Sequence, residues 1–316
     1  MELIARAELI ADGGAAARSE EFFRCRPYLD AEGTSHTLRI ETSGAPLVAP
    51  LLVRDIPEGA GLDAVSPYGY PGIVREDGAA PTEVLDPATV DWSSTGLVSF
   101  FLRSTATGPH ALAAAERSTL QISDPAGKRK SRMSDRQQIR RNEAAGYATE
   151  ILPGPEASED WRAGFRRAYE QTMVRSEASQ CYFFEREWFD SVFSSPRTWL
   201  VVVNAPEDGG IAAASIGALS DGVLHYFLSG TADEHLREAP MKNAIVTLQD
   251  LSDELGAPLN LGGGLSPGDG LEEFKRGFAN RQEPFLTHEV VCDDHAYERL
   301  SAGREAKPGF FPDYRA

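Results

Sequence analysis

The amino-acid sequence predicts an α+β fold built from two domains. Its 316 residues are enough for about two domains of ordinary length. In both halves, short apolar runs and segments of helical periodicity follow one another as helix, hairpin strands, helix and apolar strand. A stretch rich in proline, glycine and acids, Ile151–Asp160, separates the halves. We therefore expect a coarse tandem duplication, with domains over 1–150 and 151–316 and a C-terminal tail, 303–316, that docks on the first domain.

The first half contains mainly predicted strands. Apolar, strand-forming runs occur at His36–Thr42, Leu47–Val53 and Gly96–Arg103. The first two are joined by a short turn. Helices are expected over Ala111–Gln121 and over the basic residues 128–145.

The second half has clearer boundaries. Ser158 is a suitable N-cap for a helix that ends at Arg175, and Pro240 and Gly256 bracket another. A shorter helix is expected at 185–193. Strands are expected at Trp199–Asn204, Ile211–Leu219, Val223–Ser229 and Leu259–Leu261.

The composition argues against a disulfide-rich protein, a metalloprotein and a membrane-spanning protein. Three widely spaced cysteines, Cys25, Cys181 and Cys292, do not suggest a disulfide framework or a zinc site. The six histidines form no closely spaced pair, so neither a metal nor a cofactor is expected. No apolar run reaches the ~20 residues of a membrane helix, and the N-terminus does not look like a secretion signal. A reduced cytoplasmic protein, with a monomer favoured, is the expectation.

The charge is unevenly distributed. The chain carries a net charge of −17, yet seven cations and one acid lie within 128–141, near the expected domain boundary. On a helix, Arg129, Arg132, Arg136 and Arg140 would share a face. Such a face either is solvated or forms inter-domain salt bridges, or it contacts an anionic group such as the tRNA acceptor stem or an acceptor phosphate. The sequence leaves these interpretations open.

The stretch from Leu259 to Phe278 is the leading candidate for chemistry. A short apolar strand precedes Gly262-Gly263-Gly264, and Asp269 can cap the next helix. On that helix Lys275 follows Phe274, at the edge of an apolar face. A cation held there can stabilise the oxyanion that forms during acyl transfer. The spacing matches neither a Walker phosphate loop nor a dinucleotide-binding loop, and a glycine turn with a surface lysine remains the alternative.

The pattern GGG followed by D-x-L-x-x-F-K-R-x-F resembles the C-terminal motif of the Fem-like aminoacyltransferases. These proteins contain two tandem GNAT domains and transfer amino acids from aminoacyl-tRNA, in peptidoglycan cross-bridge synthesis or in the extension of small peptides. Three further stretches resemble the family in the same order: Arg129–Glu150, Phe165–Phe184 and Phe227–Thr231. The resemblance implies two GNAT-like domains, each a mixed sheet flanked by helices.

The resemblance also implies roles for individual residues. Lys275 and Phe274 would lie at the ester carbonyl of the charged tRNA. Tyr68 and Tyr70 would lie in the acceptor site. Substrate contacts are also expected from Tyr182, Tyr226, Gly262 and Gly263. Apart from the resemblance, Arg175 at the end of its helix either clamps a substrate carboxylate or solvates the helix end. The basic residues Arg129, Arg132, Arg136 and Arg140 would contact the tRNA donor.

Two other functions remain open. A GNAT enzyme could instead use acyl-CoA or a carrier-protein thioester, although Gly230–Met241, where pyrophosphate would bind, contains Asp233, Glu234 and Glu238. A non-catalytic module that binds peptide or RNA is the second. The expected partners are thus aminoacyl-tRNA and a small peptide or amine acceptor.

Overall fold

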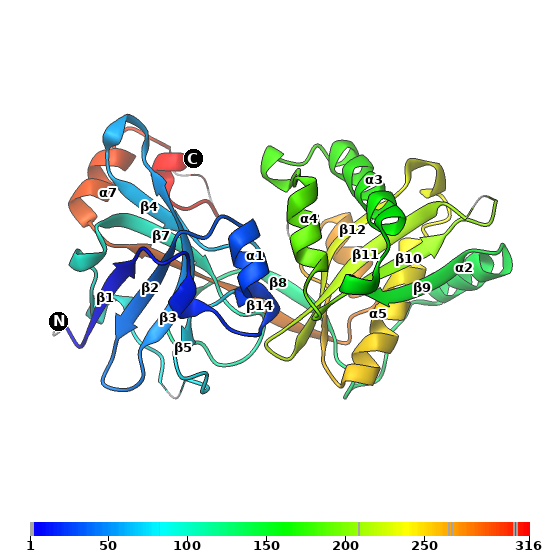
Figure 1. Cartoon of the computed structure of the whole chain (residues 1–316), viewed down its shortest axis with the longest axis horizontal. Coiled ribbons are helices and arrows are strands. Elements are labelled where there is room, and N and C mark those ends of the chain that lie inside the picture. The colour runs from blue at the N-terminus through cyan, green and yellow to red at the C-terminus, as the bar shows by residue number, and fades with distance from the viewer. Residues whose placement is uncertain are drawn as a thin grey trace. The chain divides into compact units, whose positions relative to one another are not determined.

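The computed structural model describes residues 3–81, 83–207, 209–264, 266, 268–305, 307 and 309–316 (Figure 1). The chain divides into two compact units, one of Met1–Ser118 with Pro284–Ala316 and one of Thr119–Glu283. Two strands, β8 (Ala115–Ser123) and β14 (Arg281–Val291), pass from one unit to the other. The division therefore differs from the single boundary expected near residue 150, because β14 returns to pair with β7 (Leu97–Arg103) in the first unit.

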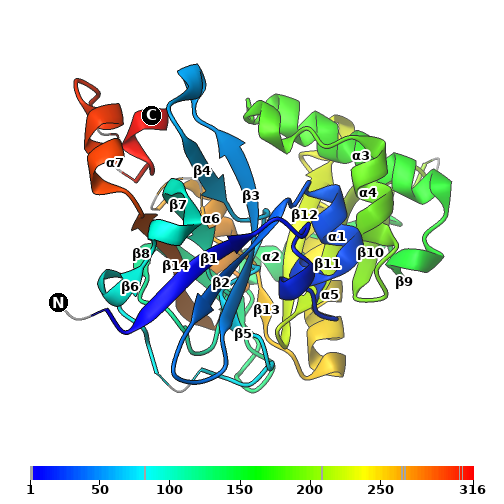
Figure 2. The same cartoon turned by 60° about the vertical axis from the view of Figure 1, so that its left-hand side comes forward.

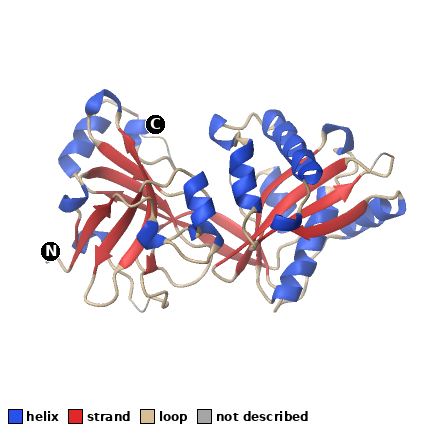
Figure 3. Ribbon diagram, viewed as in Figure 1, coloured by secondary structure: helices blue, strands red, loops and turns tan. Residues whose placement is uncertain are grey.

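The first unit is built on a mixed sheet (Figure 3). Its strands follow the order β6-β1-β2-β3-β4-β7-β14, and β5 pairs with β3. The β1/β6 and β4/β7 pairs are parallel, and the other registered pairs are antiparallel. The other strands and helices of this unit are β1 (Ala5–Ile10), β2 (His36–Glu41), β3 (Leu47–Asp55), β4 (Leu62–Val65), β5 (Val74–Arg75), β6 (Val90–Asp91), α1 (Arg26–Ala31) and α7 (Asp294–Ser301).

The end of the chain packs in the first unit through a buried carboxylate. Asp63 on β4 is fully buried and accepts hydrogen bonds from the Tyr314 hydroxyl, at 3.2 Å, and from Arg315. The guanidinium of Arg54 also lies 2.9 Å from this carboxylate. Tyr314 is itself buried, and its hydroxyl lies 2.7 Å from the Ser99 hydroxyl.

The remaining strands of the same mixed sheet belong to the second unit. The strands of this unit follow the order β8-β13-β12-β11-β10-β9, and of the pairs described within it only β12 with β13 is parallel. The elements are α2 (Met133–Ala144), β9 (Ala148–Pro153), α3 (Glu159–Arg175), α4 (Arg186–Phe193), β10 (Thr198–Asn204), β11 (Ile211–Ser220), β12 (Val223–Thr231), α5 (Met241–Leu255), β13 (Leu259–Asn260) and α6 (Gly270–Arg276).

Helices cover both faces of this sheet, with α3 and α4 on one face and α5 on the other (Figure 2). The face under α5 holds a continuous apolar core in which Val201 and Val203 of β10 meet Ile245 and Leu248 of α5. Val201 and Val203 share this face because successive side chains of a strand point to opposite faces of the sheet.

The two parallel strands β12 and β13 separate after a short ladder. They pair only at Leu224 with Leu259 and at His225 with Asn260. Beyond that point β12 continues to Thr231, while the other strand stays with β8, because Leu261 and Gly262 form backbone hydrogen bonds with Gln121. The sheet is thus open between β12 and the glycine turn.

Most of the predicted elements are confirmed, including the capped helices α3 and α5. Ser158 Oγ accepts from the Trp161 amide, and Gly256 adopts φ 62° at the end of α5. The helix predicted over Ala111–Gln121 is wrong, since the chain forms strand β8 there. Its alanines favour a helix, but the residues from Leu120 to Ser123 are all buried within the sheet.

In the described part of the chain, no helix has the length and apolar character that crossing a membrane would require.

Candidate functional site

Helix α6 positions the lysine that the sequence singled out. Asp269 caps it, because its carboxylate accepts from the Glu272 amide at 2.7 Å and from the Ser266 amide at 2.9 Å. The Glu272 carboxylate accepts from the Gly268 amide at 2.7 Å. These bonds satisfy backbone donors that a helix start leaves free, and they define where α6 begins.

Lys275 is buried on this helix. Its side chain is only 9 % exposed, and Nζ donates to the Gly263 carbonyl over 2.7 Å. Burial lowers the pKa of Lys275 to about 8, and the nearby Asp269 carboxylate opposes that shift. The amine therefore lies next to the glycine turn. It is protonated at neutral pH and loses its proton in mild alkali.

The glycines of the turn make room for these two polar groups. Gly262 has φ 78°, a conformation that favours glycine, and a Cβ there would lie 3.1 Å from Lys275 Nζ. A Cβ on Gly264 would lie 2.5 Å from a carboxylate oxygen of Asp269. Gly262 and Gly264 thus have a steric reason that the sequence did not reveal.

Two residues that the sequence pattern did not single out hold the turn in place. The Asn260 side chain accepts from the Gly262 amide at 2.8 Å. The Gln121 amide donates to the Gly262 carbonyl at 3.1 Å, and the Leu261 amide donates to the Gln121 carbonyl. In the sequence, the only sign of these two residues is that they are polar within apolar strands. Their polarity does not show which backbone groups they bind.

Apolar side chains flank the lysine. The rings of Phe274 and Phe278 lie 5.6 Å apart, and Phe278 is fully buried in the α5 core. Phe274 and Tyr226 pack against the same core from its edge. Burial raises the pKa of Tyr226 to about 12, so its hydroxyl stays protonated and can donate a hydrogen bond.

Arg175 and Tyr182 already have partners within the second unit. The Arg175 guanidinium pairs with Asp233 and donates to Thr172 Oγ1 at 3.0 Å. The carbonyl of Tyr182 accepts from the Tyr169 hydroxyl at 2.8 Å. For Arg175 to bind a substrate carboxylate, that group would have to compete with Asp233.

Tyr68 and Tyr70 belong to the first unit. The Tyr68 amide donates to Glu32 at 2.7 Å, and its carbonyl accepts from the Tyr28 hydroxyl at 2.8 Å. The Tyr70 ring lies edge-on to Phe23 and Phe285, with 5.6 Å between centroids in each case. Both tyrosines are thus held by their own unit.

The basic segment is not one helical face. Helix α2 begins only at Met133, so Arg136 and Arg140 lie on it while Arg129 and Arg132 precede it. Arg129 lies 2.8 Å from Asp250, and Arg132 lies 3.0 Å from Glu273. The sequence prediction of a shared face is therefore wrong, because these two side chains bind acids of α5 and α6.

The remaining cations of the segment differ from this pair. Arg136 and Arg140 are exposed, and no described carboxylate lies within 4.0 Å of either guanidinium. No group of metal-binding side chains occurs among the described residues.

Comparison with known proteins bears on the fold. Residues 129–264 match the family model described as the acetyltransferase (GNAT) domain. The structure is similar to FemX, with a TM-score of 0.53 and 10% identity over 83% of this chain and 89% of that one. It is also similar to L-PGS from Bacillus licheniformis, with a TM-score of 0.51 and 15% identity over 78% of this chain and 81% of that one.

A third similar structure is the C-terminal domain (DUF2156) of a protein assigned as a lysylphosphatidylglycerol synthetase from Agrobacterium fabrum. Its TM-score is 0.55, at 13% identity over 92% of this chain and 94% of that one. No curated protein sequence matches the chain.

The fold predicted from the sequence is thus confirmed: the chain has an α+β fold of GNAT type, similar over most of its length to FemX. The matched residues, 129–264, include the strand pair β12 and β13, and Lys275 follows them within the same compact unit.

Proposed function

We propose that this protein transfers an aminoacyl group from aminoacyl-tRNA to the amine of a small peptide, natural-product or cell-wall precursor. The observation that carries the proposal is the buried ammonium of Lys275, held 2.7 Å from the Gly263 carbonyl at the point where β12 and β13 separate. The similarity in fold to FemX supports it.

The aminoacyl transfer requires little from the protein beyond the positioning of the two reactants and of one cation. The acceptor amine attacks the ester carbonyl, so a C–N bond forms, the ester C–O bond breaks, and a ribose hydroxyl leaves with a proton from the amine. Negative charge collects on the carbonyl oxygen in between. A fixed cation in a partly dry site stabilises that charge, and orientation of the two reactants supplies much of the remaining acceleration.

The exposed arginines of α2 support RNA as the donor. Arg136 and Arg140 are free of described carboxylates, in a chain with a net charge of −17. Cations on a protein that is otherwise acidic favour contact with a localised polyanion, and phosphate contacts would make binding depend on salt.

Acyl transfer from CoA is the second candidate, and the match of residues 129–264 to the acetyltransferase domain favours it. The segment before α5 argues against pyrophosphate binding, because it presents Glu234 and Glu238 in addition to Asp233, which Arg175 neutralises. Calorimetry with acetyl-CoA distinguishes the two: a low-micromolar dissociation constant would replace the aminoacyl proposal with this one.

The direct test incubates the protein with a pool of charged tRNA and candidate amines, with and without ribonuclease. Mass spectrometry is expected to show amide products that disappear when the RNA is digested first. Products that persist after digestion, or that need acetyl-CoA, would contradict the proposed donor.

A further inference from the structure

One half-buried arginine of the first unit has hydrogen-bond donors that the described residues do not use. Arg103 is the last residue of β7, and its guanidinium donates only through Nη1, to the carbonyl and the hydroxyl of Ser66, each at 3.5 Å. Nε and Nη2 donate to no described acceptor. Neither group is among the fully buried donors that lack a partner, so a ligand can reach both from the surface.

The position of Arg103 is fixed by its backbone and by two aromatic rings. Its amide donates to Ser66 Oγ at 3.2 Å, and its carbonyl accepts from the Gly72 amide at 3.1 Å. The guanidinium carbon lies 5.7 Å from the centre of the Tyr68 ring and 5.3 Å from that of Phe101, within the range of cation–π attraction. A donor held in this way loses little conformational freedom when it binds an anion.

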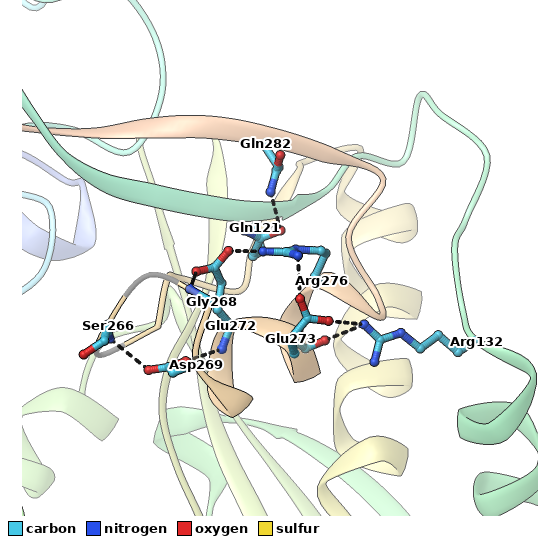
Figure 4. A network of polar contacts seen from close by, with 9 residues as sticks. All are labelled: Gln121, Arg132, Ser266, Gly268, Asp269, Glu272, Glu273, Arg276 and Gln282. Atoms are coloured by element: carbon cyan, nitrogen blue, oxygen red, sulfur yellow. Dashed lines mark hydrogen bonds and ion pairs between the residues drawn. The ribbon is translucent and has the colours of Figure 1, made fainter.

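Comparable arginines of this protein have carboxylate partners. Arg117 lies 5.2 Å from the centre of the same phenylalanine ring and pairs with Glu289. In the second unit, Arg276 pairs with Glu272 (Figure 4). By contrast, no described carboxylate lies within 4.0 Å of the Arg103 guanidinium. Arg103 therefore presents a positive charge that no described ion pair neutralises.

The charges around Arg103 favour a ligand with one negative charge. The Glu32 carboxylate accepts from the Tyr68 amide at 2.7 Å, and its charge and that of Arg103 both act on the buried Tyr28 hydroxyl. This carboxylate would repel a doubly charged phosphate twice as strongly as a carboxylate ligand. At direct contact the guanidinium outweighs the more distant Glu32, because the interaction of two charges falls with their separation.

We propose that Arg103 binds the free carboxylate of a small amino acid or peptide. Nε and Nη2 form one edge of the planar guanidinium group, and the two oxygens of a carboxylate match the two parallel donors of such an edge. These are the two donors of Arg103 that the protein leaves unused. A zwitterionic amino acid or peptide, with no net charge, also suits a site in which one cation and one carboxylate lie near each other.

The proposed reaction indicates which substrate brings this carboxylate. In an aminoacyl-tRNA the α-carboxyl group is esterified, whereas an acceptor peptide has both its amine and its C-terminal carboxylate free. Arg103 would therefore bind the acceptor at the end opposite to the attacking amine. The binding of a carboxylate rests on the first unit alone, and only its assignment to the acceptor rests on the proposed function.

The test measures binding to the full chain by calorimetry. The probes are an equimolar mixture of dipeptides that end in alanine and the same mixture as C-terminal amides. The free acids are expected to bind about tenfold more tightly than the amides, since only they offer a carboxylate to the guanidinium. Inorganic phosphate at the same ionic strength is expected to bind more weakly than the free acids.

Arg103→Lys should weaken binding of the free acids about tenfold, because it keeps the charge and removes the planar fork. Arg103→Gln should weaken it at least as much. The matched control is Arg117→Gln combined with Glu289→Gln, which removes an arginine from the same ring together with its partner and leaves the net charge unchanged. It should change binding less than twofold. Thermal melts show whether each variant is folded.

The proposal is overturned if the amides bind as tightly as the free acids, if Arg103→Lys behaves like the control, or if no dipeptide binds at millimolar concentration. Tighter binding of phosphate would also overturn it, in favour of a phosphate ligand. None of these measurements involves acyl transfer. Carboxylate binding without any transfer would therefore refute the proposed reaction and leave the binding site established.

Discussion

At the scale of single residues, the protein holds one amine in an unusual state. Lys275 is buried with one hydrogen bond to Gly263, and its pKa falls from 10.5 to about 8 through burial. Burial of a charged amine lowers the stability of the folded protein, so a functional role best explains why this lysine is buried.

Replacing this lysine tests that use. We expect Lys275→Met to lower the single-turnover rate of aminoacyl transfer on the order of 10²-fold, the typical loss for one oxyanion-stabilising donor. Thermal melting at neutral pH should be unchanged or higher, because a buried charge is removed. Arginine should rescue only partly, since its planar fork cannot replace a compact ammonium. A methionine variant that transfers at nearly the wild-type rate would remove Lys275 from the mechanism.

The lowered pKa of Lys275 predicts two pH effects. The charged form is present below about pH 8 and lost above it, so the transfer rate should fall above pH 8 once the acceptor amine is neutral. Because the folded pKa lies below the unfolded value of 10.5, the unfolded chain binds more protons between these pH values. The free energy of unfolding should therefore rise from pH 8 to 10.5 by a few kcal/mol.

Both effects should be absent from Lys275→Met. Urea titrations from neutral pH to about pH 11 measure the stability effect. A rise of equal size in the methionine variant would show that another group causes it.

At the scale of elements, the turn between β13 and α6 depends on the absence of side chains. Gly264→Ala places a methyl group 2.5 Å from Asp269, so it should displace the cap of α6 and lower stability by about 1–2 kcal/mol. Gly270→Ala, at the start of the same helix, meets no atom within 4 Å and should be neutral or slightly stabilising. Denaturant unfolding of the two variants measures the difference, and equal stabilities would argue against the cap being displaced.

The basic segment likewise divides into two pairs with different roles. Arg136→Glu with Arg140→Glu should flatten the salt dependence of donor binding by about one for each phosphate that is no longer bound, with melting unchanged. Arg129→Glu with Arg132→Glu should lower the melting temperature, because it places like charges beside Asp250 and Glu273. Anisotropy with labelled tRNA and thermal melts separate the two effects. An unchanged salt slope in the α2 variant would show that this face is only solvated.

At the scale of the whole molecule, the first unit is completed by a segment that is distant in sequence. Strand β14 pairs with β7, and Tyr314 and Arg315 satisfy the buried Asp63 on β4. Deleting the last five residues should leave that carboxylate with Arg54 alone and cost roughly 2–4 kcal/mol of stability. In the shortened chain, Asp63→Asn should restore part of the loss. Scanning calorimetry checks this, and a shortened protein that melts normally would show that the contact contributes nothing.

The sequence by itself determined the features that depend on neighbours along the chain. The caps at Ser158, Gly256 and Asp269, and the strands of the second half, follow from local hydrogen bonding and periodicity. The placement of Lys275 on a helix after a glycine turn follows in the same way. Local patterns suffice here because their partners lie within a few residues.

Only the tertiary structure decided what depends on distant partners. Residues after Ala115 form a strand rather than a helix because the sheet surrounds them, and Arg129 and Arg132 are bound by acids more than a hundred residues away. Gln121, Lys130 and Arg276 line one hollow of the second unit, although no spacing in the sequence brings their segments together. Such contacts form only when distant segments come together in the fold. The sequence shows which groups require a hydrogen-bond or ion-pair partner, and only the tertiary structure shows which partner each group finds.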